Sequence, residues 1–377
     1  SRTEKHQDVN GELTPTINAE AEELVGIARA MGERNKGVLQ GISDFYDFDS
    51  EFNVFKEMAK VSGRPISITV EQQDARPDYW RQLLSGLTEA QKEGLDMQGQ
   101  VPPRATGVLL GLTVSLNPFS LYPSYGAINP LPLEEQMTYW NDPEFKTKLL
   151  AEEPIDFGSP LLEEIVNSFD KMFRLGEPAN YEPKPEDSIA AEAKRKGVTP
   201  QEIAYDMMAA NDGKALIYHP LFNYLPGNLD FVEEMLKHPH TLFGLSDGGA
   251  HCGALCDASF PTTLIQHWGR DREGNKLPLE HLIHMQTQKT ASQVGMLDRG
   301  VLKPGYRADV NIIDFENLTL HEPTVVHDLP AGGRRLTQRA SGYAYTLVAG
   351  EVAFINGDPT GILNGGLVRG SQAAPGA

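Results

Sequence analysis

The chain has 377 residues, of which 40% are hydrophobic and 23% are charged, and its formal net charge is −19. This size can hold one large α/β domain, alone or with a smaller appended unit. The negative charge argues against a nucleic-acid partner and against an anionic membrane surface. The longest apolar run, 107–116, is shorter than the ~18 residues that a membrane-spanning helix needs, so we expect no membrane span.

The cysteine content points to a reducing compartment. Cys252 and Cys256 are too few for a disulfide framework, and the paired spacing of common zinc sites is absent. The first residues, 1–6, lack the apolar segment of a secretory leader. We therefore expect a cytoplasmic protein with small buried thiols, although Cys252 directly follows His251 and is placed to line the same pocket.

The first hundred residues alternate between helical and extended patterns. Apolar stripes at helical spacing predict helices, and runs of alternating apolar residues predict strands. The predicted helices are 18–34, 51–62 and 77–94, and the predicted strands are 37–43, 65–71 and 98–101. Helix and strand joined by short loops predict βα units and a parallel sheet.

This rhythm breaks between about 104 and 185, where proline, asparagine and aromatic residues are frequent and only 161–175 looks helical. We interpret this segment as an insertion at the strand ends, where such loops often shape a binding pocket. The rhythm resumes with a helix at 199–211, in which Thr199 is the cap and Pro200 the first helical residue. A strand at 215–218 and a helix at 229–237 follow.

A short apolar strand at 241–245 runs into a glycine-containing loop that carries the strongest functional signal. The loop brings together three polar residues and two glycines: Ser246, Asp247, His251, Gly248 and Gly249. A carboxylate and an imidazole after a buried parallel strand occupy the usual position of chemistry in α/β folds. The alternative is an aspartate that caps a turn beside a solvated histidine.

The last hundred residues change from helices to strands. We predict helices at 261–270, 278–287 and 290–295, followed by strands at 307–314, 343–348 and 351–356. The last two strands meet at Ala349-Gly350 as in a hairpin. This region should form a small β unit packed on the α/β body.

Three motifs resemble the amidohydrolase superfamily, and within it the N-acyl-D-amino-acid deacylase (D-aminoacylase) family. They are Leu-Ser-Asp-Gly-Gly-Ala-His at 245–251, Asp-Arg-Gly-Val-Leu-Lys-Pro-Gly-Tyr-Arg-Ala-Asp at 298–309 with the apolar strand after it, and the turn at 349–350. The resemblance implies a partial TIM-type (β/α)8 barrel with a small C-terminal β-sandwich portion. It also implies that the chain is the C-terminal portion of a longer protein and lacks the first barrel strands.

The resemblance suggests two parts of the chain. Residues 1–300 would form the barrel portion, including the insertion at about 104–185, and residues 301–377 would supply the sandwich strands and a tail.

The resemblance also implies a reaction. Members of that family hydrolyse the amide of an N-acylated D-amino acid with a metal-bound hydroxide. Asp247 matches the aspartate that deprotonates the water and passes the proton to the leaving nitrogen. A divalent metal, for which we predict zinc, lowers the pKa of bound water to ~7, and a nearby carboxylate shuttles the proton. The predicted partner is a small N-acyl amino acid or a related amide.

The metal ligands are less clear, because the His-x-His or His-x-Asp pair of the superfamily is absent and the positions of its middle-strand histidines hold other residues. Besides Asp247, we consider Glu71 and His219 as candidate ligands, each at a predicted strand end. Glu71 could instead cap a helix or form a salt bridge, and His219 could be a non-functional strand-end imidazole. His251 is a second catalytic candidate, because it could bind the metal or polarise the carbonyl.

Two arginines could hold the carboxylate of the substrate. Arg104 follows a predicted strand, and Arg270 lies one helix beyond the glycine loop. Arginine forks suit carboxylates, whereas the alternative for Arg270 is a charge that stabilises a helix end. With Ser246, Gly248 and Gly249 they form the predicted substrate-binding set.

Two other functions stay open. An enzyme of the same fold could cleave a cyclic amide or a carbamoyl group, because fold does not determine substrate. The chain could also be a non-catalytic barrel that has lost its metal and serves as a binding or scaffold subunit.

Overall fold

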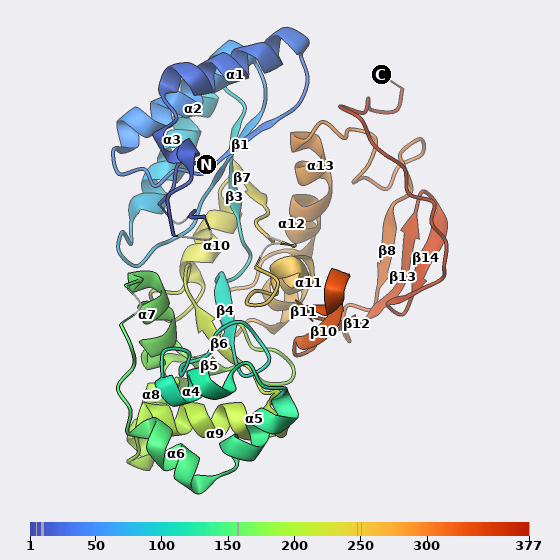
Figure 1. Ribbon diagram of the computed structural model, residues 1–377. Coiled ribbons are helices and arrows are strands. Elements are labelled where there is room, and N and C mark those ends of the chain that lie inside the picture. The colour runs from blue at the N-terminus through green and yellow to red at the C-terminus, as the bar shows by residue number, and fades with distance from the viewer. Residues whose placement is uncertain (5, 9–10, 157, 247, 250, 377) are drawn as a thin grey trace.

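The computed structural model describes residues 1–4, 6–8, 11–156, 158–246, 248–249 and 251–376. Figure 1 shows three parts. They are an α/β body formed by the first hundred residues with later helices, a helical lobe below this body, and a unit of antiparallel strands at the right of the picture. The described part of the chain contains no helix long and apolar enough to cross a membrane.

The body is built on a parallel sheet, as the alternating pattern predicts. Its strands are β1 (Leu39–Gly41), β2 (Ile66–Thr69), β3 (Met97–Val101) and β7 (Thr241–Phe243), in the order β1-β2-β3-β7. The helices of the body are α1 (Ala21–Arg34), α2 (Phe48–Ser62), α3 (Tyr79–Lys92) and α10 (Asp230–Lys237). The helices that follow β7 are α11 (Phe260–Gln266), α12 (Leu279–His284) and α13 (Thr290–Gln293).

One face of this sheet packs closely on the helices. Gly41, Ile68 and Gly99 are register partners across three strands. A Cβ at Gly41 would clash with Phe55 of α2, and one at Gly99 would lie 3.0 Å from Leu87 of α3. The two glycines therefore allow the helices to approach the sheet.

The other face of the sheet carries polar side chains. The Gln40 amide donates a hydrogen bond to Gln100 Oε1 at 2.8 Å, and the Gln100 amide donates to Ser67 Oγ at 3.0 Å. These bonds link β1, β2 and β3. Gln40 stands where the resemblance would place a middle-strand histidine, so this strand contributes an amide there.

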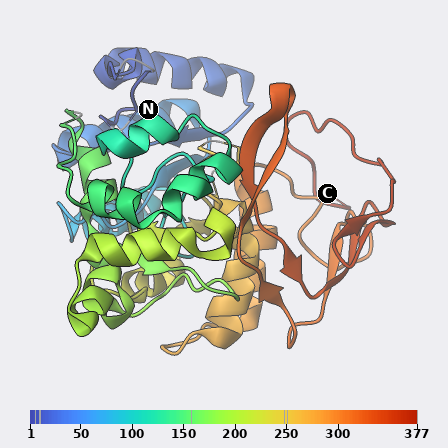
Figure 2. The ribbon, with the colours of Figure 1, turned by 60° about the horizontal axis from the view of Figure 1, so that its bottom comes forward.

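The lobe has its own sheet and its own core. Its strands, β4 (Gly107–Leu110), β6 (Ile217–Pro220) and β5 (Phe173–Arg174), are antiparallel and lie in the order β4-β6-β5. Its helices are α4 (Pro123–Ile128), α5 (Leu133–Trp140), α6 (Pro143–Leu150), α7 (Pro160–Asn167), α8 (Ile189–Lys196) and α9 (Pro200–Gly213). An apolar cluster that includes residues from 108 to 217 holds them together. Figure 2 shows these helices grouped on one side of the molecule.

The prediction that the parallel rhythm resumes at 199–218 is wrong. β6 pairs antiparallel with β4, and one face of α9 packs in the lobe, where Tyr205 stacks on Trp140 with ring centroids 4.3 Å apart. The start of α9 is as predicted, because Thr199 and Glu202 form a capping box. Local signals therefore located the helix, and tertiary packing decided its place.

The C-terminal unit confirms the predicted strands. The strands β8 (Val310–Ile313), β13 (Tyr343–Val348), β14 (Glu351–Ile355) and β15 (Asp358–Pro359) form an antiparallel sheet in the order β15-β14-β13-β8. Ala349 and Gly350 both have positive φ, 50° and 85°, as a tight hairpin turn requires. The division of the chain at residue 300 and the limits of the insertion remain proposals.

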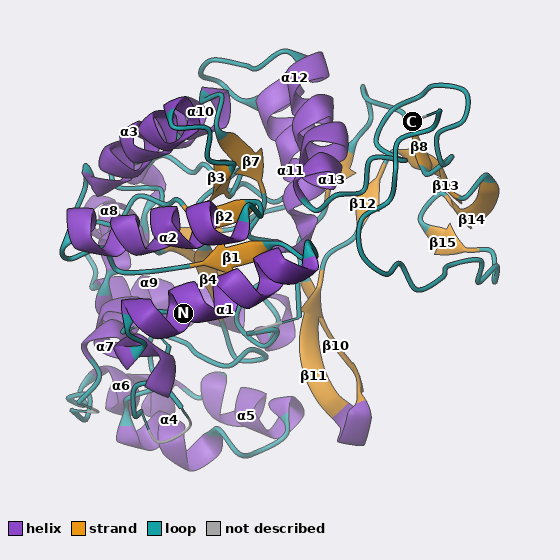
Figure 3. Ribbon diagram, turned by 90° about the horizontal axis from the view of Figure 1, so that it is seen from above, coloured by secondary structure: helices purple, strands orange, loops and turns teal. Residues whose placement is uncertain are grey.

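A further hairpin was not predicted. Its strands are β10 (Thr324–Leu329) and β11 (Gly333–Thr337), and a two-stranded pair, β9 (Thr319–Leu320) and β12 (Ala340–Ser341), connects it to the rest of the β unit. Figure 3 shows this hairpin projecting from the β unit, and residues of the hairpin and of α5 line one cavity. We call residues 322–337 the arm.

Candidate active site

The predicted site residues of the body gather at one edge of the parallel sheet. Glu71 follows β2, Arg104 follows β3, and Ser246 follows β7. Because parallel strands end at the same edge, these residues come from neighbouring loops. The chain also enters the lobe from this edge, since β4 begins six residues after β3 ends.

The strand before the glycine loop is shorter than predicted. β7 ends at Phe243, and Gly244 donates its N–H to Val101 O at 3.1 Å. Leu245 then has φ of 62°, a left-handed conformation that turns the chain. Ser246 is half-buried, and Gly248 and Gly249 are exposed.

Asp247, the predicted proton shuttle and metal ligand, lies outside the described residues, so both roles stay predictions. His251 is described: it is exposed and has φ of 48°. Its carbonyl accepts N–H bonds from Ala254 at 2.8 Å and Leu255 at 2.9 Å. His251 thus forms a tight turn at the surface of the loop, and its catalytic role stays a prediction.

The second half of the loop is anchored to the lobe and to the arm. Cys252 O accepts the N–H of Leu336 at 2.7 Å, and Gly253 O accepts that of Ser115 at 2.8 Å. Ala254 O is bonded to Leu109 N at 2.8 Å. The segment that carries His251 is therefore fixed by the backbone of β4, of the turn after it, and of β11.

Arg104 ties the loop after β3 to the end of the glycine loop. It is 1% exposed, and it donates to Cys256 O at 3.1 Å, Asp257 Oδ1 at 3.1 Å and Thr263 Oγ1 at 3.2 Å. Its guanidinium also lies 3.4 Å from the ring centroid of Tyr181. These bonds hold the guanidinium within the protein, so a role in binding a substrate carboxylate remains a proposal.

Arg270 faces a different part of the molecule. It donates to the carbonyls of Phe315 and Leu318 and pairs with Asp271. These contacts fasten the segment that leads into β9. The predicted role of Arg270 as a carboxylate clamp has no support from its position.

The two remaining candidate ligands lie in different sheets. Glu71 is buried at the end of β2, where Gln73 Nε2 lies 3.5 Å from its carboxylate. His219 is fully buried on β6, and its Nδ1 lies 2.9 Å from Ile165 O. Burial lowers the pKa of His219 to about 4, which keeps the ring neutral. The prediction that His219 ends a strand of the parallel sheet is wrong, because β6 belongs to the lobe.

No three His, Cys, Asp or Glu side chains are grouped to hold a metal ion among the residues that the structure describes. These side chains alone therefore do not fit the divalent metal that the resemblance implies. Cys252 and Cys256 are both free, and Cys256 is buried, as predicted for its thiol.

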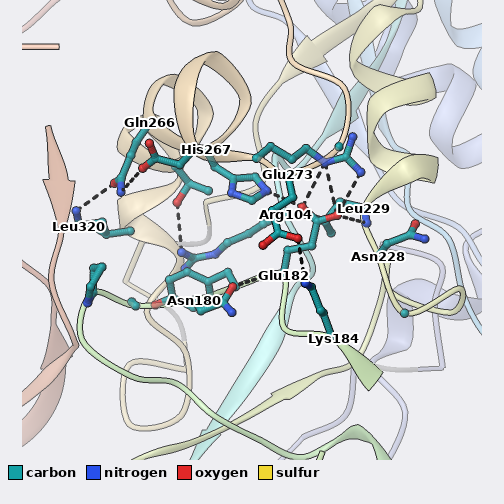
Figure 4. A pocket seen from close by; sticks show the side chains of 18 of the residues that line it. Arg104, Asn180, Glu182, Lys184, Asn228, Leu229, Gln266, His267, Glu273 and Leu320 are labelled. Carbon is teal, nitrogen blue, oxygen red and sulfur yellow. Dashed lines mark hydrogen bonds and ion pairs between the residues drawn. The ribbon is translucent and has the colours of Figure 1, made fainter. Parts of the chain in front are cut away.

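A cavity of about 650 Å³ lies beside Arg104, between the lobe and α11. Figure 4 shows its wall, which is rich in charged groups. Glu182 lies 2.6 Å from His267 Nε2 and 3.0 Å from Arg272. Burial alone would raise the pKa of Glu182, but hydrogen bonds from His267 and Arg272 outweigh it and bring the pKa to about 2. This network fastens the lobe to the body.

Sequence reasoning gave no functional role to Glu182 or to His267. The side chain of His267 is 22% exposed. Its partner is 85 residues away in the chain, and no local pattern marks either residue.

The structure thus combines a parallel sheet, a glycine-containing loop after the last strand of that sheet, and a C-terminal β unit. The chain belongs to the amidohydrolase family, because residues 2–354 match the model of that family. The family resemblance inferred from the motifs is thereby confirmed. No curated protein matches the chain.

Solved structures share the fold. A D-aminoacylase that defines a novel subset of amidohydrolases has a TM-score of 0.51 and 15% identity, over 93% of this chain and 59% of its own. A structure from work on the binuclear metal centre of D-aminoacylase has a TM-score of 0.52 and 16% identity, with the same coverage. The chain thus spans 59% of the length of these proteins. At this identity the likeness shows the fold.

Proposed function

We propose that the protein hydrolyses the C–N bond of a small amide, with an N-acyl-D-amino acid as the substrate. The observation that supports this most is the position of the glycine loop. It follows a parallel strand at the edge where Glu71 and Arg104 also emerge, and backbone bonds from the lobe and the arm anchor it. Family membership and the likeness to D-aminoacylases agree with this chemistry.

In the proposed reaction Asp247 accepts a proton from the water that attacks the carbonyl carbon. It then returns this proton to the nitrogen, which leaves as an amine. Protonation of the nitrogen is necessary because an amide anion is a poor leaving group, and a carboxylate held in place can transfer the proton in both directions. Ser246 and the backbone of Gly248 and Gly249 would contact the substrate, and His251 would polarise the carbonyl.

A divalent metal, for which we predict zinc, belongs to this proposal because a protein of similar fold, a D-aminoacylase, has a binuclear metal centre. Such a metal would supply Lewis acidity. We assign no step to it, because the described residues do not form a ligand set.

The cytoplasmic location also remains a proposal. It rests on the two free thiols, Cys252 and Cys256.

Release of acetate from N-acetyl-D-leucine, with N-acetyl-L-leucine as the matched control, tests the proposal. We expect turnover of the D-enantiomer that exceeds that of the L-enantiomer, and a loss of turnover when metal is removed by a chelator. Equal turnover of both enantiomers would reject the D-amino-acid specificity. No turnover of either enantiomer, with metal supplied, would reject the hydrolase for this substrate class.

The second candidate is a non-catalytic binding or scaffold subunit. The observation that favours it is that Gln40 and Glu71 stand near the positions of the superfamily's middle-strand histidines. A protein that binds N-acetyl-D-leucine with unchanged affinity after Asp247→Ala, and releases no acetate, would support this alternative.

A further inference from the structure

A second cavity, of about 700 Å³, lies between the lobe and the arm. The lobe contributes residues around 112–113, 129–136 and 211–216, and the arm contributes residues around 322–334. None of the proposed catalytic or substrate-binding residues lines it. We call it the arm cavity.

Apolar side chains form about half of the wall of the arm cavity. They include Leu112, Leu131, Leu133, Leu216 and Val325. Pockets for small molecules usually measure about 300–1,000 Å³ and combine apolar side chains with a few convergent polar groups. The arm cavity has this size and both kinds of side chain.

One polar group of the wall has an unused acceptor. The Gln136 side chain is buried, and its amide nitrogen donates to Asn129 O at 3.1 Å and Leu131 O at 2.8 Å. These two carbonyls determine which end of the amide is nitrogen, because a flipped amide would set oxygen against oxygen. Gln136 Oε1 is therefore an acceptor, and it is buried with no partner among the described residues. Gln136 lines the arm cavity, but this oxygen has almost no accessible surface, so a ligand with an O–H or N–H donor would satisfy it after the side chain turns toward the cavity.

Two cations also belong to the wall. Lys214 and Arg334 are exposed, and neither forms an ion pair within the described part of the chain. Gly213, the residue before Lys214, packs closely on α5, because a Cβ on Gly213 would lie 2.6 Å from Met137 Sδ. Lys214 therefore leaves the backbone close to α5 and to Gln136. Arg334 donates one N–H to Thr113 O at 3.2 Å, and its fork has further donors.

The charge of the wall favours an anion. Its ionisable side chains are Lys214, Arg334, His327 and Glu322. Two permanent cations outweigh one carboxylate, and an arginine fork with a lysine suits a carboxylate ligand.

We propose that the arm cavity binds a small amphipathic acid. The apolar chain of this ligand lies among the leucines, its carboxylate pairs with Lys214 and Arg334, and its hydroxyl or N–H donates to Gln136 Oε1. The ligand bridges the lobe and the arm, which both anchor the glycine loop.

Calorimetric titration with three eight-carbon probes tests this site. The probes are 2-hydroxyoctanoate, octanoate, which lacks the hydroxyl, and 1,2-octanediol, which lacks the charge. We expect 2-hydroxyoctanoate to bind most tightly. Octanoate should bind about threefold to tenfold more weakly, because it loses one hydrogen bond, and the diol should bind at least about tenfold more weakly, because it loses the charge pair. None of the probes contains an amide, so the outcome does not depend on the proposed hydrolysis.

Variants assign the binding to the arm cavity. Lys214→Glu should weaken 2-hydroxyoctanoate by about tenfold or more, whereas Lys148→Glu, an exposed lysine of the same lobe that does not line the cavity, should leave it unchanged. Gln136→Met should remove the preference for 2-hydroxyoctanoate over octanoate. If that variant does not fold, the comparison of Lys214→Glu with Lys148→Glu still tests whether the ligand binds in the arm cavity. No binding of 2-hydroxyoctanoate at millimolar concentration, or equal effects of Lys214→Glu and Lys148→Glu, would overturn the proposal.

Discussion

The body and the lobe are organised differently and serve the site in different ways. In the body, neighbouring parallel strands bring residues from distant parts of the sequence to one edge. In the lobe, antiparallel strands and stacked aromatic rings form a separate core. The glycine loop starts on the body but is fixed by Ser115 of the lobe and Leu336 of the arm. The body thus determines where the glycine loop begins, and the lobe and the arm hold this loop in place.

The largest expected loss of stability follows from breaking the buried ion pair between Arg104, in the loop after β3, and Asp257, at the end of the glycine loop. Arg104→Met leaves Asp257 buried without its cation, and we expect the free energy of unfolding to fall by about 3–5 kcal/mol. Arg339→Met, which breaks an ion pair whose arginine is 70% exposed, should cost at most about 1 kcal/mol. Urea unfolding of both variants measures the difference, and equal losses would show that the Arg104 pair does not connect the loops.

A buried histidine should make the lobe sensitive to acid. The pKa of His219 is lowered by burial to about 4, from an ordinary value near 6.5. The unfolded chain therefore binds the proton more readily, and stability is lost as the pH falls from about 6.5 to 4, by about 3 kcal/mol. Unfolding of His219→Gln between pH 7 and 4 should lack this decline. A parallel decline in the variant and the wild type would contradict the assignment.

The contact between lobe and body should respond to acid in a lower window. Hydrogen bonds from His267 and Arg272 hold the pKa of Glu182 at about 2 against the opposing effect of burial, so the carboxylate stabilises the fold above its unfolded pKa. This contribution, about 3 kcal/mol, is lost as the pH falls from about 4.5 to 2.

Unfolding of Glu182→Gln, followed by tryptophan fluorescence, should show no transition in this window. Glu186→Gln, an exposed carboxyl of the same segment, is the control. A wild-type curve that matches the Glu182 variant would mean that the network does not fasten the lobe.

The smallest expected changes in stability come from replacing two glycines, one closely packed and one with open space around it. Gly41→Ala in the body would place a methyl group against Phe55, and overpacking should cost about 1–3 kcal/mol. Gly126→Ala in α4 of the lobe has open space around it, and better helix propensity should add up to about 1 kcal/mol. Thermal unfolding of the two variants should shift in opposite directions, and shifts of the same sign would reject the close approach of α2 to β1.

Much of the body could be predicted because its signals are local. Alternating Ile66 and Ile68 mark β2, and the apolar stripe through Leu83 and Leu87 marks α3. The motifs at 245–251 and 298–309 also indicated the family correctly. These patterns lie within one element or one loop, so the sequence contains them completely.

The lobe and the links of the site could not be predicted in this way. The direction of β6 depends on its pairing with β4, about 110 residues earlier. The Arg104 and Asp257 side chains are 153 residues apart in the chain. Such contacts follow from tertiary packing, and a single sequence contains no periodicity that reveals them.

The most direct test of the proposed chemistry is the value of kcat/KM for N-acetyl-D-leucine in Asp247→Asn, with Asp170→Asn of the lobe as the control. If the loop after β7 carries the proton shuttle, the Asp247 variant should lose about 10²–10⁴-fold, and the Asp170 variant should match the wild type. Unchanged turnover by Asp247→Asn would contradict a catalytic role for the loop after β7.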